Sequence, residues 1–175
     1  MLQIIRCGSM SVATGLTMMA VVSCGPVDTY STDVKVFEIA IPDDAQSGYV
    51  DYREALIELP IGATRNPSAI DVVTYTYSVQ NHADAEIKAT GYATNGGQTD
   101  DQNGEDEKLY EVTVAAGEET GGNRSTNAIE EALRSGGDSF VAAIQVELTE
   151  STQNGGAVRV TASASFEDQV GFADK

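Results

Sequence analysis

The densest group of potential ligand side chains lies between residues 95 and 107, a stretch (NGGQTDDQNGEDE) without an apolar residue. Its carboxylates and amides are hard oxygen ligands of the kind that Ca2+ prefers. The spacing departs from an EF-hand loop, because Thr99 stands where the first Asp would be if Gly104 were the loop glycine. A solvated charged loop explains the same composition, so a calcium-dependent binding module is our alternative hypothesis. Its ligands would be Asp100, Asp101, Asn103, Glu105 and Asp106.

His82 is the single histidine of the chain. A Ser–His–Asp site would have to use it as the general base, but no G-x-S-x-G elbow accompanies it. One histidine also does not make a zinc site, which normally combines several His and Cys ligands. The neighbouring Asn81 and Asp84 are typical of a turn, so we expect His82 to be an exposed turn residue.

Two pairs of adjacent acids, Asp43 with Asp44 and Glu118 with Glu119, stand in polar stretches. Glycosidase chemistry needs two carboxylates facing each other in a cleft. Such clefts also carry aromatic platforms for the sugar, whereas the chain has no Trp. We therefore predict that the protein is not an enzyme and uses no cofactor, and we keep a hydrolase with loop carboxylates as a third hypothesis.

The N-terminal segment has the composition of a signal peptide. Residues 1–23 contain no acidic side chain and one basic side chain, Arg6, and residues 8–23 are small or apolar. This run is shorter than the roughly 20 apolar residues that a membrane-spanning helix needs. It ends in Val21-Val22-Ser23-Cys24, a motif that resembles the lipobox of bacterial lipoproteins.

The resemblance implies an address and an anchor. In that family the thiol at the position of Cys24 carries a diacylglyceryl group, the chain is cut before it, and the new N-terminus is acylated, commonly with palmitate. Two or more acyl chains hold a protein stably on a membrane. Gly25 replaces the Asp that marks inner-membrane retention, so the resemblance implies the outer membrane, facing the periplasm or the surface. The chain would then consist of a signal peptide (1–23), a lipidated tether (24–32) and one domain (33–175).

The predicted mature chain is strongly acidic. All 27 acidic residues and 9 of the 10 basic ones follow residue 23, which gives this part a net charge of −18. Nucleic acids and anionic headgroups both require Lys and Arg, so we expect neither as a partner. A cationic ligand or a basic protein remains compatible with the charge. With Cys24 acylated, the domain has no free thiol for disulfides or metal ligation.

Alternation of apolar and polar residues with a period of two predicts about seven strands. Residues 69–94 read as a hairpin, and so do the strands at 140–148 and 158–167. Residues 33–42 change phase after Val36, which indicates a bulge or an edge strand. Residues 49–61 fit either a strand or a helix, and we favour a strand.

A single short helix is predicted near 127–134. Asn127 and Glu130 form its capping pair, and Gly136-Gly137 ends it. Its apolar stripe consists of Ile129, Ala132 and Leu133. Residues 117–125, just before it, read as a polar loop.

The fold class that follows is mainly β, an antiparallel β-sandwich of immunoglobulin-like type with one short helix. The alternating run at residues 73–81 is similar to the middle strand of bacterial immunoglobulin-like surface domains. We accordingly predict a non-enzymatic, lipid-anchored envelope protein that serves in binding or assembly. Its partners would be the membrane, through the lipid on Cys24, and an envelope protein or surface ligand. If the strand at 34–41 lies at a sheet edge, a partner strand can add there.

Overall fold

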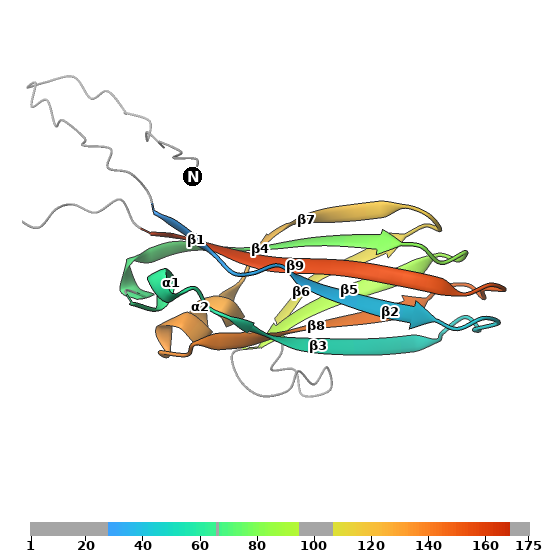
Figure 1. Ribbon diagram of the computed structural model, residues 1–175, viewed down its shortest axis with the longest axis horizontal. Coiled ribbons are helices and arrows are strands. Elements are labelled where there is room, and N and C mark those ends of the chain that lie inside the picture. The colour runs from blue at the N-terminus through green and yellow to red at the C-terminus, as the bar shows by residue number, and fades with distance from the viewer. Residues whose placement is uncertain (1–27, 66, 95–106, 169–175) are drawn as a thin grey trace, which may run out of the picture.

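The computed structural model describes residues 28–65, 67–94 and 107–168, which form two stacked antiparallel β-sheets (Figure 1). In the five-stranded sheet, β1 and β2 both pair along one edge of β9, and β4 and β7 follow. The four-stranded sheet has the order β3-β8-β5-β6. The predicted β-sandwich is therefore confirmed. The elements are β1 (Thr29–Ser31), β2 (Lys35–Ile41), β3 (Val50–Glu58), α1 (Ile61–Arg65), the 3-10 helix η1 (Pro67–Ala69), β4 (Ile70–Asn81), β5 (Ile87–Thr94), β6 (Glu107–Val114), β7 (Glu119–Ser125), α2 (Asn127–Arg134), β8 (Ser139–Leu148) and β9 (Gly156–Asp168).

The strand pairs are nested along the chain. β2 pairs with β9, β3 with β8, β4 with β7 and β5 with β6. This is one long hairpin whose arms have rolled up, so that β4 also meets β9 and β5 also meets β8. An immunoglobulin sandwich has sheets of order A-B-E-D and C-F-G instead. The order found here is that of a jelly roll, so the prediction of an immunoglobulin-like type is wrong.

Both predicted hairpins are also wrong, although their strands exist. β4 lies in the five-stranded sheet and β5 in the four-stranded one, and β8 and β9 are divided between the sheets in the same way. The turns that join them cross from one sheet to the other. Period-two alternation reports which side chains face inward, and it does not report which strand is the neighbour.

The strand predicted within residues 49–61 is confirmed over Val50–Glu58, and the edge position predicted as one alternative for residues 33–42 is confirmed as well. Residues 49–61 contain β3, whose Ile57 is buried and is followed by the buried Leu59, while Ile61 begins α1 and is exposed. β2 lies at an edge of its sheet. Its register with β9 runs without a shift from Lys35 to Ile41, so the alternative of a bulge is wrong.

The predicted polar loop at 117–125 is wrong, because β7 occupies most of it and pairs with β4. The strand was missed because it contains no apolar residue. Its two glycines allow close approach to β4. A Cβ on Gly121 would lie 2.7 Å from the carbonyl oxygen of Tyr77, and one on Gly122 would lie 3.4 Å from the Tyr77 hydroxyl.

The predicted tether is shorter than expected. β1 lies within it and pairs with the end of β9. The backbone N–H of Thr32 donates to the Ala164 carbonyl at 2.9 Å, and its Oγ1 accepts from the Ala164 N–H at 3.0 Å. Asp28 and Asp168 are also hydrogen-bonded to each other. The folded domain thus begins by residue 28 rather than at residue 33.

Helix α2 confirms the predicted helix and its buried stripe, but not its cap. Thr126, rather than Asn127, is the N-cap, and its Oγ1 accepts from the Ile129 N–H at 3.5 Å. The carboxylate of Glu107 accepts from the Ala128 N–H at 2.7 Å, which places a negative charge at the positive end of the helix. α1 and η1 were not predicted, because a single turn gives no periodic signal.

Three tyrosines form the centre of the core. The rings of Tyr77 on β4 and Tyr110 on β6 stack with centroids 3.7 Å apart, and Tyr75 lies 6.5 Å from Tyr110. Gly91 makes room, since a Cβ there would lie 2.1 Å from a Tyr110 ring carbon. The hydroxyls of Tyr75 and Tyr110 are buried and have no hydrogen-bond partner. Burial raises the pKa of both phenols.

We expect Tyr110→Phe to leave the free energy of unfolding at pH 7 unchanged or to raise it by about 1 kcal/mol, because it removes a buried hydroxyl that lacks a partner. Tyr77→Phe is the matched control. The unfolded chain loses phenolic protons above pH ~10, whereas the folded chain keeps them. Stability therefore falls as the pH rises above ~10, and less steeply in the variant. Denaturant unfolding at pH 7 and pH 11 measures both effects, and clear destabilisation of Tyr110→Phe at pH 7 would contradict the assignment.

Candidate functional site

The predicted ligand and lipidation residues lie outside the described part of the chain, so their roles stay predictions. These residues are Cys24, Asp100, Asp101, Asn103, Glu105 and Asp106. Among the described residues, no group of three or more His, Cys, Asp or Glu side chains is placed to hold a metal ion. No helix in this part is long and apolar enough to span a membrane.

Four loops meet at one end of the sandwich, which we call the loop end. They are the connections at residues 42–49, 82–86, 115–118 and 149–155. The opposite end carries β1, α1 and α2, and we call it the helical end (Figure 1). His82 is exposed in the second of these loops, as expected, and its backbone N–H donates to the Ala157 carbonyl at 2.8 Å. The predicted acidic pairs are also exposed here: Asp43, Asp44, Glu118 and Glu119.

Asn81 is the buried polar centre of the loop end. Its Nδ2 donates to the carbonyls of Ala85, Val114 and Ala115 at 2.9, 3.0 and 3.1 Å, respectively. Its Oδ1 accepts from the Ala83 N–H at 3.0 Å. One side chain therefore joins the β4–β5 turn to the end of β6.

Asp84 organises the neighbouring turn. Its carboxylate accepts from the Thr152 hydroxyl and from the backbone and side-chain nitrogens of Asn154. These hydrogen bonds lower the pKa of Asp84, and the one from Thr152 has the largest effect. The Thr152 hydroxyl also accepts from the Gly155 N–H at 2.8 Å. The carboxylate is thus engaged in fixing loop structure rather than in catalysis.

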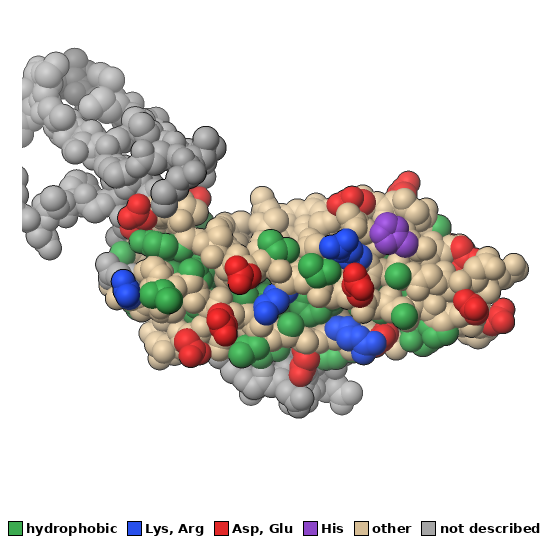
Figure 2. Space-filling view, viewed as in Figure 1, with side chains coloured by type: hydrophobic (Ala, Val, Ile, Leu, Met, Phe, Trp, Pro, Cys, Tyr) green, Lys and Arg blue, Asp and Glu red, His purple; other side chains and the backbone are tan. Residues whose placement is uncertain are grey.

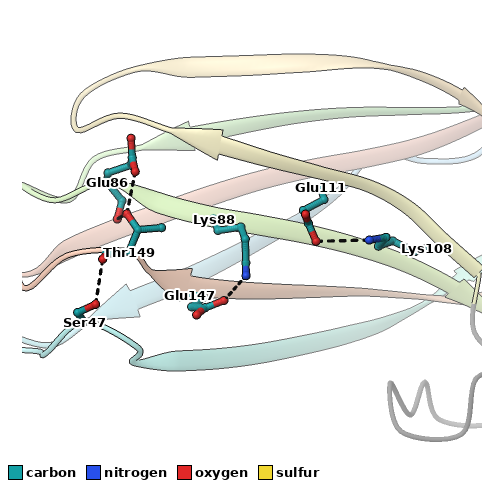
Figure 3. A network of polar contacts seen from close by, with 7 residues as sticks. All are labelled: Ser47, Glu86, Lys88, Lys108, Glu111, Glu147 and Thr149. Atoms are coloured by element: carbon teal, nitrogen blue, oxygen red, sulfur yellow. Dashed lines mark hydrogen bonds and ion pairs between the residues drawn. The ribbon is translucent and has the colours of Figure 1, made fainter.

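The outer face of the four-stranded sheet carries a second set of polar contacts (Figure 3). Lys88 and Glu147 face each other across β5 and β8 with 2.5 Å between N and O, and Glu147 raises the pKa of Lys88. On β6, Lys108 and Glu111 lie 3.4 Å apart. Lys88 and Lys108 each form an ion pair with a glutamate of the same domain.

The exposed large hydrophobic side chains of the described residues lie on neighbouring elements at one edge of the sandwich. β2 and β3 are edge strands of the two sheets, and they run next to each other along this side, which Figures 1 and 2 view from the front. We call it the β2–β3 side. In the described part of the chain, five large hydrophobic side chains are exposed, and all lie on β2 and its approach, on β3 or on α1. They are Val34, Val36, Val50, Leu56 and Ile61.

Comparison with protein family models finds no match, and no curated protein matches the chain. Solved structures give distant similarities. The chain is similar to a protein of infectious bursal disease virus, Gx strain, with 13% identity and a TM-score of 0.36, over 97% of this chain and 39% of that one. It is also similar to the infectious bursal disease virus VP2 subviral particle, with 14% identity and a TM-score of 0.37, over 96% of this chain and 39% of that one. The similarity to desmodium yellow mottle tymovirus has 5% identity and a TM-score of 0.33 and covers 99% of both chains.

The chain spans about two fifths of the length of the two bursal disease virus chains. At such TM-scores and identities, the similarity carries no argument about what this chain does. The jelly-roll assignment rests on the strand order alone.

We expect Thr152→Val to raise the pKa of Asp84, because the variant removes its first hydrogen-bond donor. The stability linked to this carboxylate is present above its unfolded pKa of ~3.9 and is lost as the pH falls through the lower folded value. In the variant, the linked stability is smaller and its loss is complete at a higher pH. Carboxyl titration by NMR measures the shift, and Thr149→Val, at another hydroxyl of this end, is the control that leaves Asp84 unchanged.

Proposed function

We propose that the chain is a lipid-anchored bacterial envelope protein whose jelly-roll domain binds a partner protein through β2. The observation that supports this most strongly is the edge strand β2 on the β2–β3 side, where Val34 and Val36 are exposed. The lipobox-like motif at residues 21–24 supports the anchor.

The path of the chain suits display from a membrane. It enters the fold at β1, at the helical end. Four residues lie between Cys24 and Thr29, and the five residue steps from one to the other reach at most ~18 Å. The thirteen residues of β9 extend for about 40 Å towards the loop end. An anchored domain would hold its helical end at the bilayer, with β2 and the loop end further out.

β2 has the features of a strand that accepts another strand. It pairs with β9 along seven residues and has no proline between Lys35 and Ile41. Val34 is 62% exposed and Val36 46% exposed, so a partner would gain apolar contact in addition to main-chain hydrogen bonds. The net charge of the chain favours a basic partner. No described residue favours the calcium or hydrolase alternatives over this one.

We expect Cys24→Ser to move the protein from the membrane fraction to the soluble fraction in its bacterial host. The serine hydroxyl would not be acylated, and stable anchoring needs more than one acyl chain. Cys7→Ser is the matched control and stays with the membrane. Intact mass of the wild-type protein should fit residues 24–175 with attached lipid. The mass of the complete, unmodified chain would refute the anchor.

For the binding edge, we expect a photo-cross-linking residue at Glu38 in β2 to capture an envelope protein. The double variant Val34→Lys, Val36→Lys should abolish that adduct, because edge lysines oppose strand addition. Ser78→Lys is the control, since Ser78 faces outward in the same row of the sheet as Val36, two strands away. Surface changes of this kind shift stability by only about 0.5 kcal/mol. An adduct that survives the double variant would reject β2 as the binding edge.

A further inference from the structure

A groove at the helical end lies where β3 stops and α1 begins. Its volume is about 340 Å3. Leu59 is buried at this groove, while Leu56 and Ile61 are 56% and 68% exposed. The other lining residues are Glu58, Thr64, Asp138 and Ser139.

The groove combines apolar walls with two carboxylates from neighbouring strands. Glu58 stands opposite Ser139 in the β3–β8 ladder. The adjacent Asp138 accepts the Leu59 N–H with its backbone carbonyl at 2.7 Å. This pairing keeps the backbones of Glu58 and Asp138 close together. Among the described contacts, the Asp138 carboxylate accepts a hydrogen bond only from the Ser139 hydroxyl, at 3.0 Å.

Among the described residues, neither of these two carboxylates is paired with a cation. Of the ion pairs between described residues, none involves Glu58 or Asp138. Arg65, at the end of α1, pairs with neither of them among the ion pairs of the described residues. The groove therefore presents uncompensated negative charge beside exposed aliphatic surface.

We propose that this groove takes the lysine or arginine side chain of a partner protein. The aliphatic stem would lie along Leu56 and Ile61, and the cationic end would meet the two carboxylates. Long basic side chains bury their methylenes on apolar surface while the charge stays near water, which suits an open groove of this kind. Phosphate headgroups would be repelled here, and a purely apolar ligand would leave the carboxylates unused. The groove is separate from β2, so a negative result for the groove would leave the proposal of β2 as a binding edge intact.

The test is a 15N chemical-shift titration of the whole protein at low ionic strength with N-acetyl-lysine methylamide. The norleucine analogue, which keeps the stem and lacks the charge, is the matched probe. We expect shifts at the amides of Leu59, Thr64 and Ser139, with the norleucine compound binding about fivefold more weakly, as loss of an exposed charge pair implies. Salt should weaken the lysine compound selectively.

The matched protein variants are Glu58→Gln with Asp138→Asn, expected to bind the lysine compound about fivefold more weakly, and Glu118→Gln at the loop end, expected to bind normally. Unchanged spectra away from the groove show that the double variant is folded. Equal binding by the norleucine compound, unaltered binding by the double variant or no shifts at the groove would overturn the proposal. Tighter binding of cadaverine than of the lysine compound would assign the groove to a free diamine, and would overturn a protein side chain as the occupant of this groove.

Discussion

The side-chain amide of Asn81 is the contact on which the loop end of the sandwich depends. It lies where the chain leaves β4 for the opposite sheet, and it is fully buried. There it satisfies the carbonyls of Ala85, Val114 and Ala115 and the N–H of Ala83. A buried backbone group without a partner costs about 1–3 kcal/mol, and the carboxamide of Asn81 offers two N–H donors and an acceptor at once. Asn81 thus stabilises the crossing from β4 to β5, one of the crossings between sheets that make the fold a roll instead of a series of hairpins.

The same crossings explain what the sequence could and could not predict. Alternation along β8 and β9 follows the inward and outward faces correctly, because it depends only on burial. Strand partners depend on contacts far apart in the chain, so two consecutive strands with a turn between them read as a hairpin even where the turn changes sheets. β7 escaped prediction for a different reason. Its inward positions are small or polar, since the Tyr77 ring already fills the space beside Gly122.

The proposed binding surfaces were visible in the sequence to unequal degrees. The phase change after Val36 indicates an edge strand, because Val34 and Val36 fall opposite to the buried Phe37, Ile39 and Ile41. The groove gave no such signal. Ile61 continues the alternation of β3 in the sequence, but the chain turns into α1 after Pro60, which carries Ile61 out of the core and beside Leu56. Only the three-dimensional path brings these two side chains to the same cavity.

The distribution of charge makes the β2–β3 side a better binding surface for a basic partner than its apolar area alone suggests. Several basic side chains of the described domain are committed to local pairs: Arg53 with Asp51, Lys88 with Glu147, Lys108 with Glu111 and Arg134 with Glu130. Acids outnumber bases 27 to 10 in the whole chain, so much of the negative surface has no such compensation. Long-range attraction then speeds encounters with basic partners and repels acidic ones, including other copies of this chain. That repulsion also opposes strand pairing between copies at an exposed edge strand such as β2, because such pairing must first overcome it.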